Sequence, residues 1–489
     1  MGEDGPDGKA IVRAPMIRAL DEAPITARFW LLAGAVMVGA VLDLFDFFLI
    51  AFVVPVVSDD WDLTFGQAAA VLLGAGIGAI GGAFTWGRMG DRYGRRRPLI
   101  AGILTFSLAT GAMAAAPDDG WWYLAFLRVI VGAGVAGVAV IAVPLVLEFT
   151  PTRLRTRLTG FVTTAMVPIG ILAAALSVGL LEPVIGWRPL FAVGVVPALL
   201  AVFVAVYVPE SPRWLIEQGR LHEARRVIAW LVMRPEEELG LEAPPATREQ
   251  GRRYADILRY RSSVFVTVLA WFGASVAVSG MVLWGPTFLE RILEIDEDEA
   301  ALLFVFVTIG SFLGRLFFSF VPQRTGRRAC GLLMGFGAAP LLALAALSGQ
   351  SEVAGVSLFL LALIAASFFV DGGFANLAPY TPEVFPTNMR TQGMGLAWAA
   401  SGIGRIVGPL GVALIAGTGD LIDPEATLDA LKPAFLFLAS FSLVVGLAFV
   451  LVKLEPHGRD LETLSAELVE EAARRDHALG AAVPDVKGV

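Results

Sequence analysis

The chain contains a long series of apolar runs, each about as long as a membrane-crossing helix. An α-helix needs about 20 mostly apolar residues to cross the ~30 Å hydrocarbon core of a bilayer. Of the 489 residues, 56% are hydrophobic and only 17% are charged, against about 25% charged in soluble domains. We therefore expect an all-α membrane protein with twelve transmembrane helices in two pseudo-symmetric six-helix bundles. The expected helices are 28–57, 67–86, 98–116, 121–147, 158–180 and 187–208, followed by 263–289, 301–321, 329–348, 355–379, 392–416 and 432–454.

The polar segments between these runs divide the chain and indicate its orientation. Connections after the even-numbered helices are rich in arginine, whereas the opposite connections carry acidic pairs such as Asp59-Asp60 and Asp118-Asp119. The positive-inside rule then predicts an inner or plasma membrane protein with both termini and the linker in the cytoplasm. The expected parts are a tail 1–27, a bundle 28–208, a linker 209–262, a bundle 263–454 and a tail 455–489.

The scarcity of cysteine and histidine excludes several kinds of chemistry. Cys330 is the one cysteine, so an intrachain disulfide and a cysteine metal cluster are both excluded. The three histidines, His222, His457 and His477, all lie outside the apolar runs. A proton carrier inside the membrane must therefore be a carboxylate. No nucleophile with a base, metal-binding cluster or phosphate loop is visible, so we expect no enzyme, no cofactor and no nucleic-acid partner.

The two halves of the chain repeat one another. The segment from Glu148 to Gly160 reappears as 383–395, with every matched residue 235 positions later. The segment 92–96 recurs as 324–328, where Gln323 replaces Asp91. Parallel six-helix repeats around a central path are a transporter architecture.

Three sequence motifs resemble those of the major facilitator superfamily. The segment Gly87-Arg-Met-Gly-Asp-Arg-Tyr-Gly-Arg-Arg96 resembles the signature loop between the second and third helices. Pro209-Glu-Ser-Pro-Arg-Trp-Leu215 and Tyr380-Thr-Pro-Glu-Val-Phe-Pro386 are similar to motifs of sugar porters, organic-ion carriers and metabolite and aromatic-acid symporters. The resemblance implies a transporter that works by alternating access.

We expect the charged residues of these motifs to form a conformational latch at the cytoplasmic ends of the helices. An acidic residue near a helix N-terminus is stabilised by the helix dipole and by neighbouring arginines. Breaking and remaking the pairs Glu148–Arg155, Glu383–Arg390 and Glu210–Arg213 would favour one arrangement of the halves over another. The alternative is that these charges only solvate helix ends. The expected latch residues are Gly87, Asp91, Arg92, Gly94, Arg95, Glu148, Arg155, Glu210, Arg213, Glu383 and Arg390.

Charged residues in the first six-helix set indicate a proton-coupling site. A charge at mid-membrane costs about 3 kcal/mol or more on insertion scales. Asp43 and Asp46 lie three residues apart in helix 28–57, and Arg128 lies in helix 121–147. The resemblance to proton-linked sugar porters and aromatic-acid symporters implies that Asp46 carries the proton opposite Arg128. A static salt bridge is the alternative, and Asp43 is either structural or orients the substrate.

The second set carries two candidate substrate-binding residues, Asp371 in helix 355–379 and Arg405 in helix 392–416. Because arginine keeps its charge and presents a planar fork, Arg405 suits an anionic substrate group. An ion pair between Arg405 and Asp371 is the alternative. Arg315 is expected to be structural, with its charge reaching toward the cytoplasmic surface.

Aromatic residues suggest a planar or apolar solute rather than a sugar. Val276-Ala277 stands where sugar porters carry a glutamine pair, so a hexose would lack hydrogen-bond partners. Trp284, Phe47 and Trp398 are candidate walls of the substrate site, although each aromatic alone is more often a packing residue.

The sequence therefore predicts proton-coupled symport of a small organic solute, an organic or aromatic carboxylate, by a membrane protein that functions as a monomer. Its expected partners are that solute, protons and the lipid bilayer. The alternatives are an uncoupled facilitator, a carrier of a sugar or an organic cation, and a binding protein of the same fold that does not transport.

Overall fold

The computed structural model describes most of the chain. The described residues are 15–63, 65–151, 184–239, 254–295, 297–416, 428–452 and 461–478, with a few isolated positions between them.

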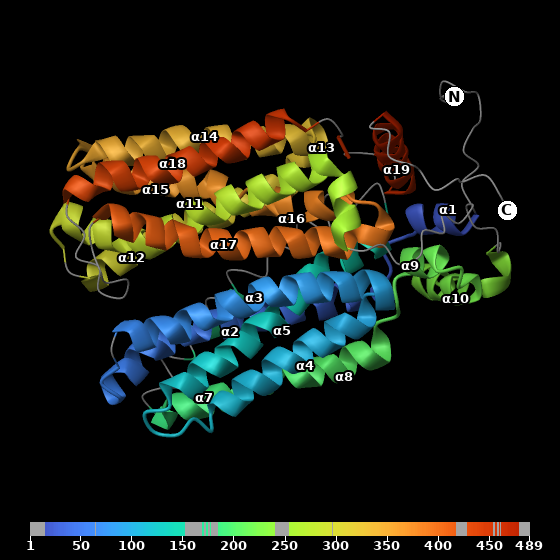
Figure 1. Cartoon of the computed structure of the whole chain (residues 1–489), viewed down its shortest axis with the longest axis horizontal. Helices are drawn as coiled ribbons and strands as arrows, with labels where there is room; N and C mark the ends of the chain where they lie inside the picture. The colour runs from blue at the N-terminus through green and yellow to red at the C-terminus, as the bar shows by residue number, and fades with distance from the viewer. Residues whose placement is uncertain are drawn as a thin grey trace.

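Two groups of long helices run side by side along the molecule (Figure 1). The first group consists of α2 (Ala27–Asp60), α3 (Phe65–Tyr93), α4 (Arg96–Met113), α5 (Trp121–Phe149), α7 (Trp187–Val193) and α8 (Pro197–Tyr207). The second consists of α11 (Arg261–Leu293), α12 (Glu297–Phe320), α13 (Pro322–Thr325), α14 (Arg327–Ser348), α15 (Leu358–Val370), α16 (Phe374–Glu383), α17 (Arg390–Ala416) and α18 (Leu428–Val450). A short hairpin, β1 (Glu352–Val353) with β2 (Val356–Ser357), joins α14 to α15, and the 3-10 helix η4 (Thr387–Met389) precedes α17.

Many of these helices are suited to a bilayer. Within the described residues, eight are long and apolar enough to cross a membrane. The predicted helix 187–208 divides into α7 and α8 before Pro197, and the predicted helix 355–379 divides into α15 and α16 at Gly372-Gly373. The predicted helix 158–180 lies largely outside the described residues.

Small residues allow the helices of the first bundle to pack closely. A Cβ added at Gly78 on α3 would lie 1.8 Å from the carbonyl oxygen of Val129 on α5. A Cβ at Gly132 on α5 would lie 1.9 Å from the carbonyl oxygen of Ala75. Because hydrocarbon gives no hydrophobic drive between helices, such close backbone packing is what holds them together.

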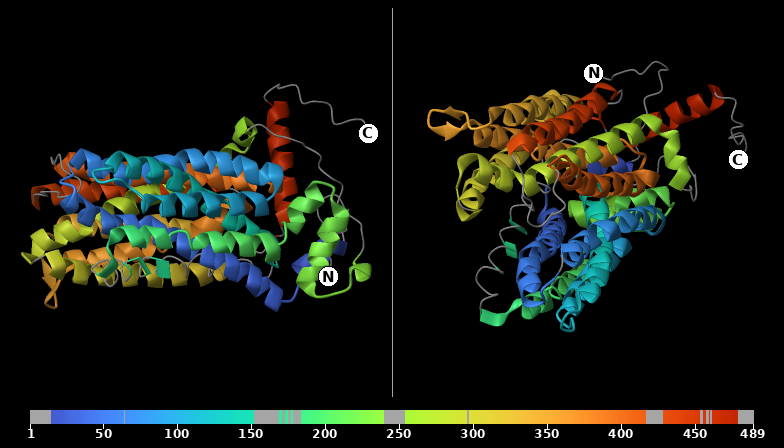
Figure 2. Two further views of the ribbon diagram at one scale, coloured as in Figure 1. Left: turned by 90° about the horizontal axis from the view of Figure 1, so that it is seen from below. Right: turned by 60° about the vertical axis from the view of Figure 1, so that its left-hand side comes forward.

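Short helices gather at one end of both bundles, which we call the linker end. They are α1 (Pro15–Asp21), α9 (Pro212–Glu217), α10 (Leu221–Val232), η2 (Glu236–Glu238), η3 (Tyr254–Arg259) and α19 (Leu461–Ala478). Figure 2 shows α19 running across the bundle axis at this end. Met16 of α1 packs into an apolar cluster with Trp214 and Ile228. Arg28 on α2 also donates to the carbonyl oxygen of Trp230 at 2.6 Å, so the start of α2 is tied to the linker helices.

Candidate functional site

A buried ion pair forms the centre of the polar network at the linker end. Arg95, in the tight turn before α4, donates from Nε and Nη2 to the two carboxylate oxygens of Glu148 at 3.1 and 2.9 Å. Its Nη1 lies 3.3 Å from Asp91 and donates to the carbonyl oxygen of Gly90 at 2.8 Å. Arg95 and Glu148 are both fully buried. Such a bidentate pair is geometrically specific, and removing one partner would leave a buried charge.

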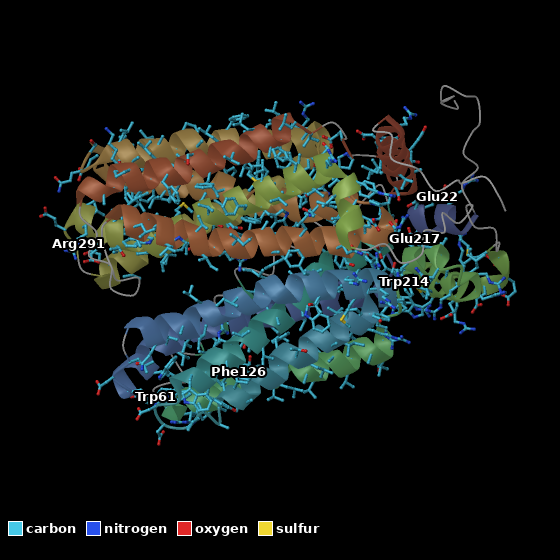
Figure 3. All side chains as sticks on the ribbon, viewed as in Figure 1. Glu22, Trp61, Phe126, Trp214, Glu217 and Arg291 are labelled. Carbon is cyan, nitrogen blue, oxygen red and sulfur yellow. The ribbon has the colours of Figure 1, made fainter. Side chains whose placement is uncertain are left out.

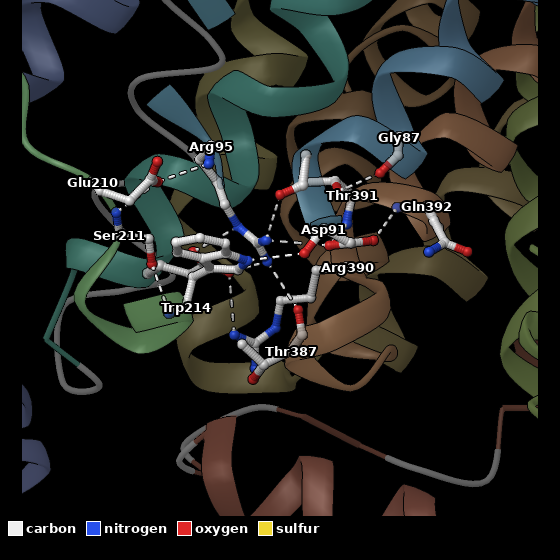
Figure 4. A network of polar contacts seen from close by, with 12 residues as sticks. Gly87, Asp91, Arg95, Glu210, Ser211, Trp214, Thr387, Arg390, Thr391 and Gln392 are labelled. Atoms are coloured by element: carbon white, nitrogen blue, oxygen red, sulfur yellow. Dashed lines mark hydrogen bonds and ion pairs between the residues drawn. The ribbon is translucent and has the colours of Figure 1, made fainter. Parts of the chain in front are cut away.

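Asp91 connects the two bundles. Its carboxylate accepts hydrogen bonds from the backbone N–H groups of Thr391 at 3.2 Å and Gln392 at 2.8 Å, in the first turn of α17 (Figure 4). These N–H groups have no partner within their own helix, and the helix dipole favours a negative charge there. The hydroxyl of Thr391 also donates to the carbonyl oxygen of Gly87 at 2.7 Å. A Cβ at Gly87 would lie 2.8 Å from the carbonyl oxygen of Thr391, so this approach requires glycine.

Two arginines add further contacts between the bundles. Arg95 donates from Nη2 to the carbonyl oxygen of Thr387 at 2.9 Å. Arg390, at the start of α17, lies 3.5 Å from Glu148 of the first bundle. Glu148 therefore contacts one arginine from each half, and the network joins α3, α5 and α17.

The second bundle repeats the central ion pair. Arg327 donates from Nε and Nη2 to Glu383 at 3.0 and 2.9 Å, in the same arrangement as Arg95 with Glu148. Gln323 stands at the repeat position of Asp91, so the second bundle lacks the carboxylate that contacts a helix start in the other half. The ion pair is thus repeated in both bundles, whereas the carboxylate contact to a helix start of the other bundle is seen only for Asp91 of the first bundle among the described residues.

A second acidic residue in each half caps the arginine turn. Glu210 accepts from the backbone N–H of Arg95 at 2.7 Å, and Glu455 accepts from that of Arg327 at 2.9 Å. In the first half, Gly94 precedes Arg95 in this turn and has a φ of 93°. A Cβ at Gly94 would lie 2.2 Å from the Glu210 carboxylate. The turn therefore depends on glycine for both conformation and space.

Two of the three predicted pairings, Glu383–Arg390 and Glu210–Arg213, are wrong in this conformation. Glu383 binds Arg327 instead of Arg390, because the arginine of each repeat reaches the acid of the same bundle. Arg213 contacts Asp21 at 2.8 Å and the Glu148 carbonyl oxygen at 3.2 Å instead of the Glu210 carboxylate. Asp21 belongs to α1, within the segment 1–27 that was predicted to be a cytoplasmic tail.

The two remaining latch candidates are Arg92 and Arg155. Arg92 is exposed, with its guanidinium carbon 5.3 Å from the ring centroid of Tyr93. Arg155, the predicted partner of Glu148, lies outside the described residues.

Glu217 is an acidic residue of this region that sequence reasoning missed. It ends α9 beside the latch and follows Trp214, whose indole donates to the carbonyl oxygen of Asp91 at 2.9 Å (Figure 3). Its Oε2 atom is buried and has no hydrogen-bond partner in the described part of the chain. Burial raises the pKa of Glu217 to about 8, although Arg390 and Arg95 nearby oppose the shift.

The predicted proton-coupling residues of the first bundle lie together. Asp46 on α2 and Arg128 on α5 are both buried, with 3.7 Å between Arg128 Nη1 and Asp46 Oδ2. The hydroxyl of Thr110 on α4 donates to Asp46 Oδ1. Asp46 Oδ2 and Arg128 Nε have no hydrogen-bond partner among the described atoms. The pair is thus close but loosely joined, unlike the bidentate pairs at the linker end.

The second bundle has its own ion pair, with a partner that sequence reasoning misjudged. Asp371 follows α15 and accepts from Arg315 of α12 at 2.7 and 2.9 Å, and from the hydroxyl of Ser311. Arg315 was expected to extend toward the surface, but it is only 9% exposed because α12 packs against α15. The spacing of Ser311 and Arg315, one helical turn apart, was the available signal.

The remaining substrate candidates have different environments. Arg405 on α17 is exposed, and its guanidinium carbon lies 5.3 Å from the ring centroid of Trp398, which is about two helical turns earlier. Trp284 is fully buried in the apolar core of the second bundle, where its indole donates to the carbonyl oxygen of Pro409 at 3.1 Å. The side chains of Asp43 and Phe47 lie outside the described part of the structure.

Two helical bundles with repeated ion pairs, joined by a latch at one end, define a membrane transport protein. A family model for sugar and other transporters matches residues 34–468, and the chain belongs to this family of the major facilitator superfamily. The predicted all-α, twelve-helix, two-bundle class is thereby confirmed, and the protein is a multi-pass transporter of small solutes rather than an enzyme.

Several known proteins are similar over nearly the whole chain. The niacin transporter NiaP of Acinetobacter baylyi is 28% identical, covering 92% of this chain and 99% of the relative. The organic cation/carnitine transporter 7 of Arabidopsis thaliana is 29% identical, covering 91% and 96%. The solved structure of the proton:xylose symporter XylE with 6-bromo-6-deoxy-D-glucose has a TM-score of 0.73 at 20% identity, covering 91% and 100%.

Replacing Asp91 with asparagine should open the latch. The substitution removes the charge that accepts from the start of α17, and a hydrogen bond to a charged group is worth about 1.5–3 kcal/mol. Met394, fully buried on α17 just beyond this contact, can report on opening. In a Cys330→Ser background, we expect a cysteine at Met394 to react with a polar thiol reagent about tenfold faster when Asp91→Asn is added. The control is Asp118→Asn, which changes an exposed acid. Equal reactivity in all three proteins would contradict the latch.

The pH dependence of the latch should depend on Glu217. The pKa of this acid is about 8 in the latched state, against an ordinary value of 4.5. Because the raised pKa favours the protonated acid, the stabilisation of the latched state is complete below pH ~4.5 and is lost as pH rises through ~8. The charges that act on Glu217 are those of Asp91, Arg95, Glu148 and Arg390. All four are present both in the wild-type protein and in a Glu217→Gln variant.

We expect labelling of the cysteine at Met394 to increase between pH 6 and 9, relative to the same reporter in a Glu217→Gln protein. Glutamine keeps the neutral shape of the acid at every pH, so this pairing also corrects for the pH dependence of the thiol. Parallel pH profiles for the two proteins would show that Glu217 does not titrate in this range.

Proposed function

We propose that the chain is a proton-coupled symporter of a small organic carboxylate. The observation that carries the proposal is the buried Asp46–Arg128 pair with Thr110 in the first bundle. The apolar runs of this chain contain no histidine. A carboxylate such as that of Asp46 must therefore carry the proton through the membrane.

The coupling step follows from the electrostatics of this pair. Arg128 stabilises the ionised form of Asp46, whereas burial favours the neutral form. A helix movement that separates α2 from α5 would remove the cation, so that the acid takes up a proton. The return movement would bring Arg128 back and release it. Asp46 Oδ2 accepts no hydrogen bond among the described atoms. Separating Asp46 from Arg128 therefore breaks few hydrogen bonds.

Arg405 is proposed to bind the carboxylate of the solute. Its side chain is exposed although it lies in the middle of a helix that is long enough to cross the membrane. A charge facing lipid at this depth would be costly, so the surface around Arg405 must be part of an aqueous path. Trp398 stacks beside the guanidinium and offers an apolar face to a ring. The similarity to a niacin transporter supports this choice, since niacin is an aromatic carboxylate.

The linker end is proposed to face the cytoplasm. Its connections carry the arginines, in agreement with the positive-inside rule. The bundles are then latched on the cytoplasmic side through Asp91 and α17, which corresponds to a path closed from that side. Alternating access requires the latch to break while the opposite ends of the bundles approach each other.

Replacing Arg405 with lysine should weaken carboxylate binding by about tenfold. Lysine keeps the charge but loses the planar fork that binds both oxygens, and one charged hydrogen bond is worth about 1.5–3 kcal/mol. The measurement is binding of nicotinate and benzoate to purified protein, with carnitine and xylose for comparison. Arg291→Lys, at the far end of α11, is the control. Unchanged affinity, or a wild-type preference for carnitine or xylose, would contradict the assignment.

Replacing Asp46 with asparagine should uncouple transport from the proton gradient. Asparagine resembles the protonated acid and cannot release a proton, so pH-driven accumulation in proteoliposomes should be lost. Counterflow exchange at equal pH on both sides should continue, because binding does not need proton release. Asp118→Asn should retain both activities. Uphill uptake by the Asp46→Asn protein would show that another acid carries the proton, and Asp43 and Asp371 would be tested next.

A further inference from the structure

A cavity at the linker end lies beside the latch, with which it shares Glu210, and outside the proposed transport path. It has a volume of about 450 Å³, within the range of about 300–1,000 Å³ that is typical of small-molecule sites. It lies between the start of α4, the segment after α8, and helices α9 and α10. Its polar lining consists of Tyr93, Arg96, Arg97, Glu210, Arg220, Glu223 and Arg226.

The charge of this cavity is positive. Four arginines face two glutamates, and both glutamates already have partners. Glu210 accepts from the backbone N–H groups of Arg95 and Arg96 in the arginine turn, and Glu223 pairs with Arg220 at 2.6 Å. Arg226 lies 3.6 Å from Glu236, which is not part of the cavity lining.

Two neighbouring cations at the start of α4 line the cavity. Arg97 is exposed and makes no ion pair among the described residues. Arg96 lies next to it in the chain and donates from Nη2 to the carbonyl oxygen of Ala205. The planar guanidinium group of arginine matches the oxygens of a phosphate.

The apolar surface beside the cavity indicates which kind of molecule carries the phosphate. Helices α4 and α8 pack against each other at the outer edge of the first bundle (Figure 1). Their outward side chains are strongly exposed, with Leu108 at 57%, Val202 at 61% and Val206 at 67%. Tyr93 and Tyr207 are half-exposed where this apolar strip meets the cavity, as is common for tyrosine at headgroup depth.

We propose that this cavity binds the phosphate headgroup of an anionic phospholipid whose acyl chains lie along α4 and α8. The lipid would connect α4 to the linker helices α9 and α10, next to Glu210 and the latch. The inference rests on the proposal that the linker end lies at the cytoplasmic membrane surface, but not on proton coupling or on the identity of the solute.

The test is lipid retention by purified, delipidated protein, measured by native mass spectrometry with phosphatidylglycerol, phosphatidylcholine and inorganic phosphate. We expect wild type to bind phosphatidylglycerol in preference to phosphatidylcholine. Arg97→Gln, alone and together with Arg220→Gln, should weaken that binding by about tenfold or more. The matched control is Arg324→Gln with Arg328→Gln, two exposed arginines at the same end of the second bundle. The single variant changes an exposed side chain with no ion pair among the described residues, so folding should be kept.

Three results would overturn the proposal. One is equal loss of lipid in the control and in the cavity variants. Another is retention that is unchanged in both cavity variants. The third is inorganic phosphate that displaces phosphatidylglycerol at equal concentration, which would make the ligand a soluble anion. A cysteine at Arg220 that reacts with an external, impermeant thiol reagent in intact cells would instead refute the orientation, and this result is independent of lipid binding.

Discussion

The buried carboxylate of Asp91 is the contact that ties the first bundle to the start of α17 in the second, and the proposed conformational change depends on it. It accepts from the first turn of α17, and Arg95 and Glu148 behind it join the same network to α5. Buried charges of this kind are stable only when every member has its partner. We therefore propose that the latch has two discrete states, formed and broken. That property would make it suitable as a switch between two arrangements of the bundles.

The sequence could predict the parts of this structure that depend on pattern. Span-length apolar runs identified the helices, and the 232- and 235-residue offsets identified the internal repeat. The structure then showed that the repeat contains equivalent ion pairs, Arg95–Glu148 and Arg327–Glu383. The resemblance to known symporters placed Asp46 opposite Arg128, and the structure brings them within 3.7 Å. Charges in apolar helices are rare and costly, so they could be recognised without a structure.

The sequence could not predict which charge would contact which. The sequence analysis paired charges that are close together in a motif, such as Arg213 with Glu210. In the folded chain, Arg213 instead contacts Asp21, 192 positions away. Asp371 and Arg315 could be recognised only once α12 was known to pack on α15. Glu217 had no signal at all, because its importance comes from the burial of one oxygen beside the latch. Contacts between elements depend on tertiary packing, which periodicity does not encode.

The most direct test of the account is to measure distances at both ends of the bundles in the same protein. Spin labels at Arg88 and Arg324 report on the linker end, and labels at Trp122 and Leu414, both exposed, report on the opposite end. Double electron–electron resonance in nanodiscs should give two populations for each pair. Asp91→Asn should lengthen the linker-end distance and shorten the other. One unchanging distance for both pairs, or changes in the same direction at both ends, would contradict a latch that controls alternating access.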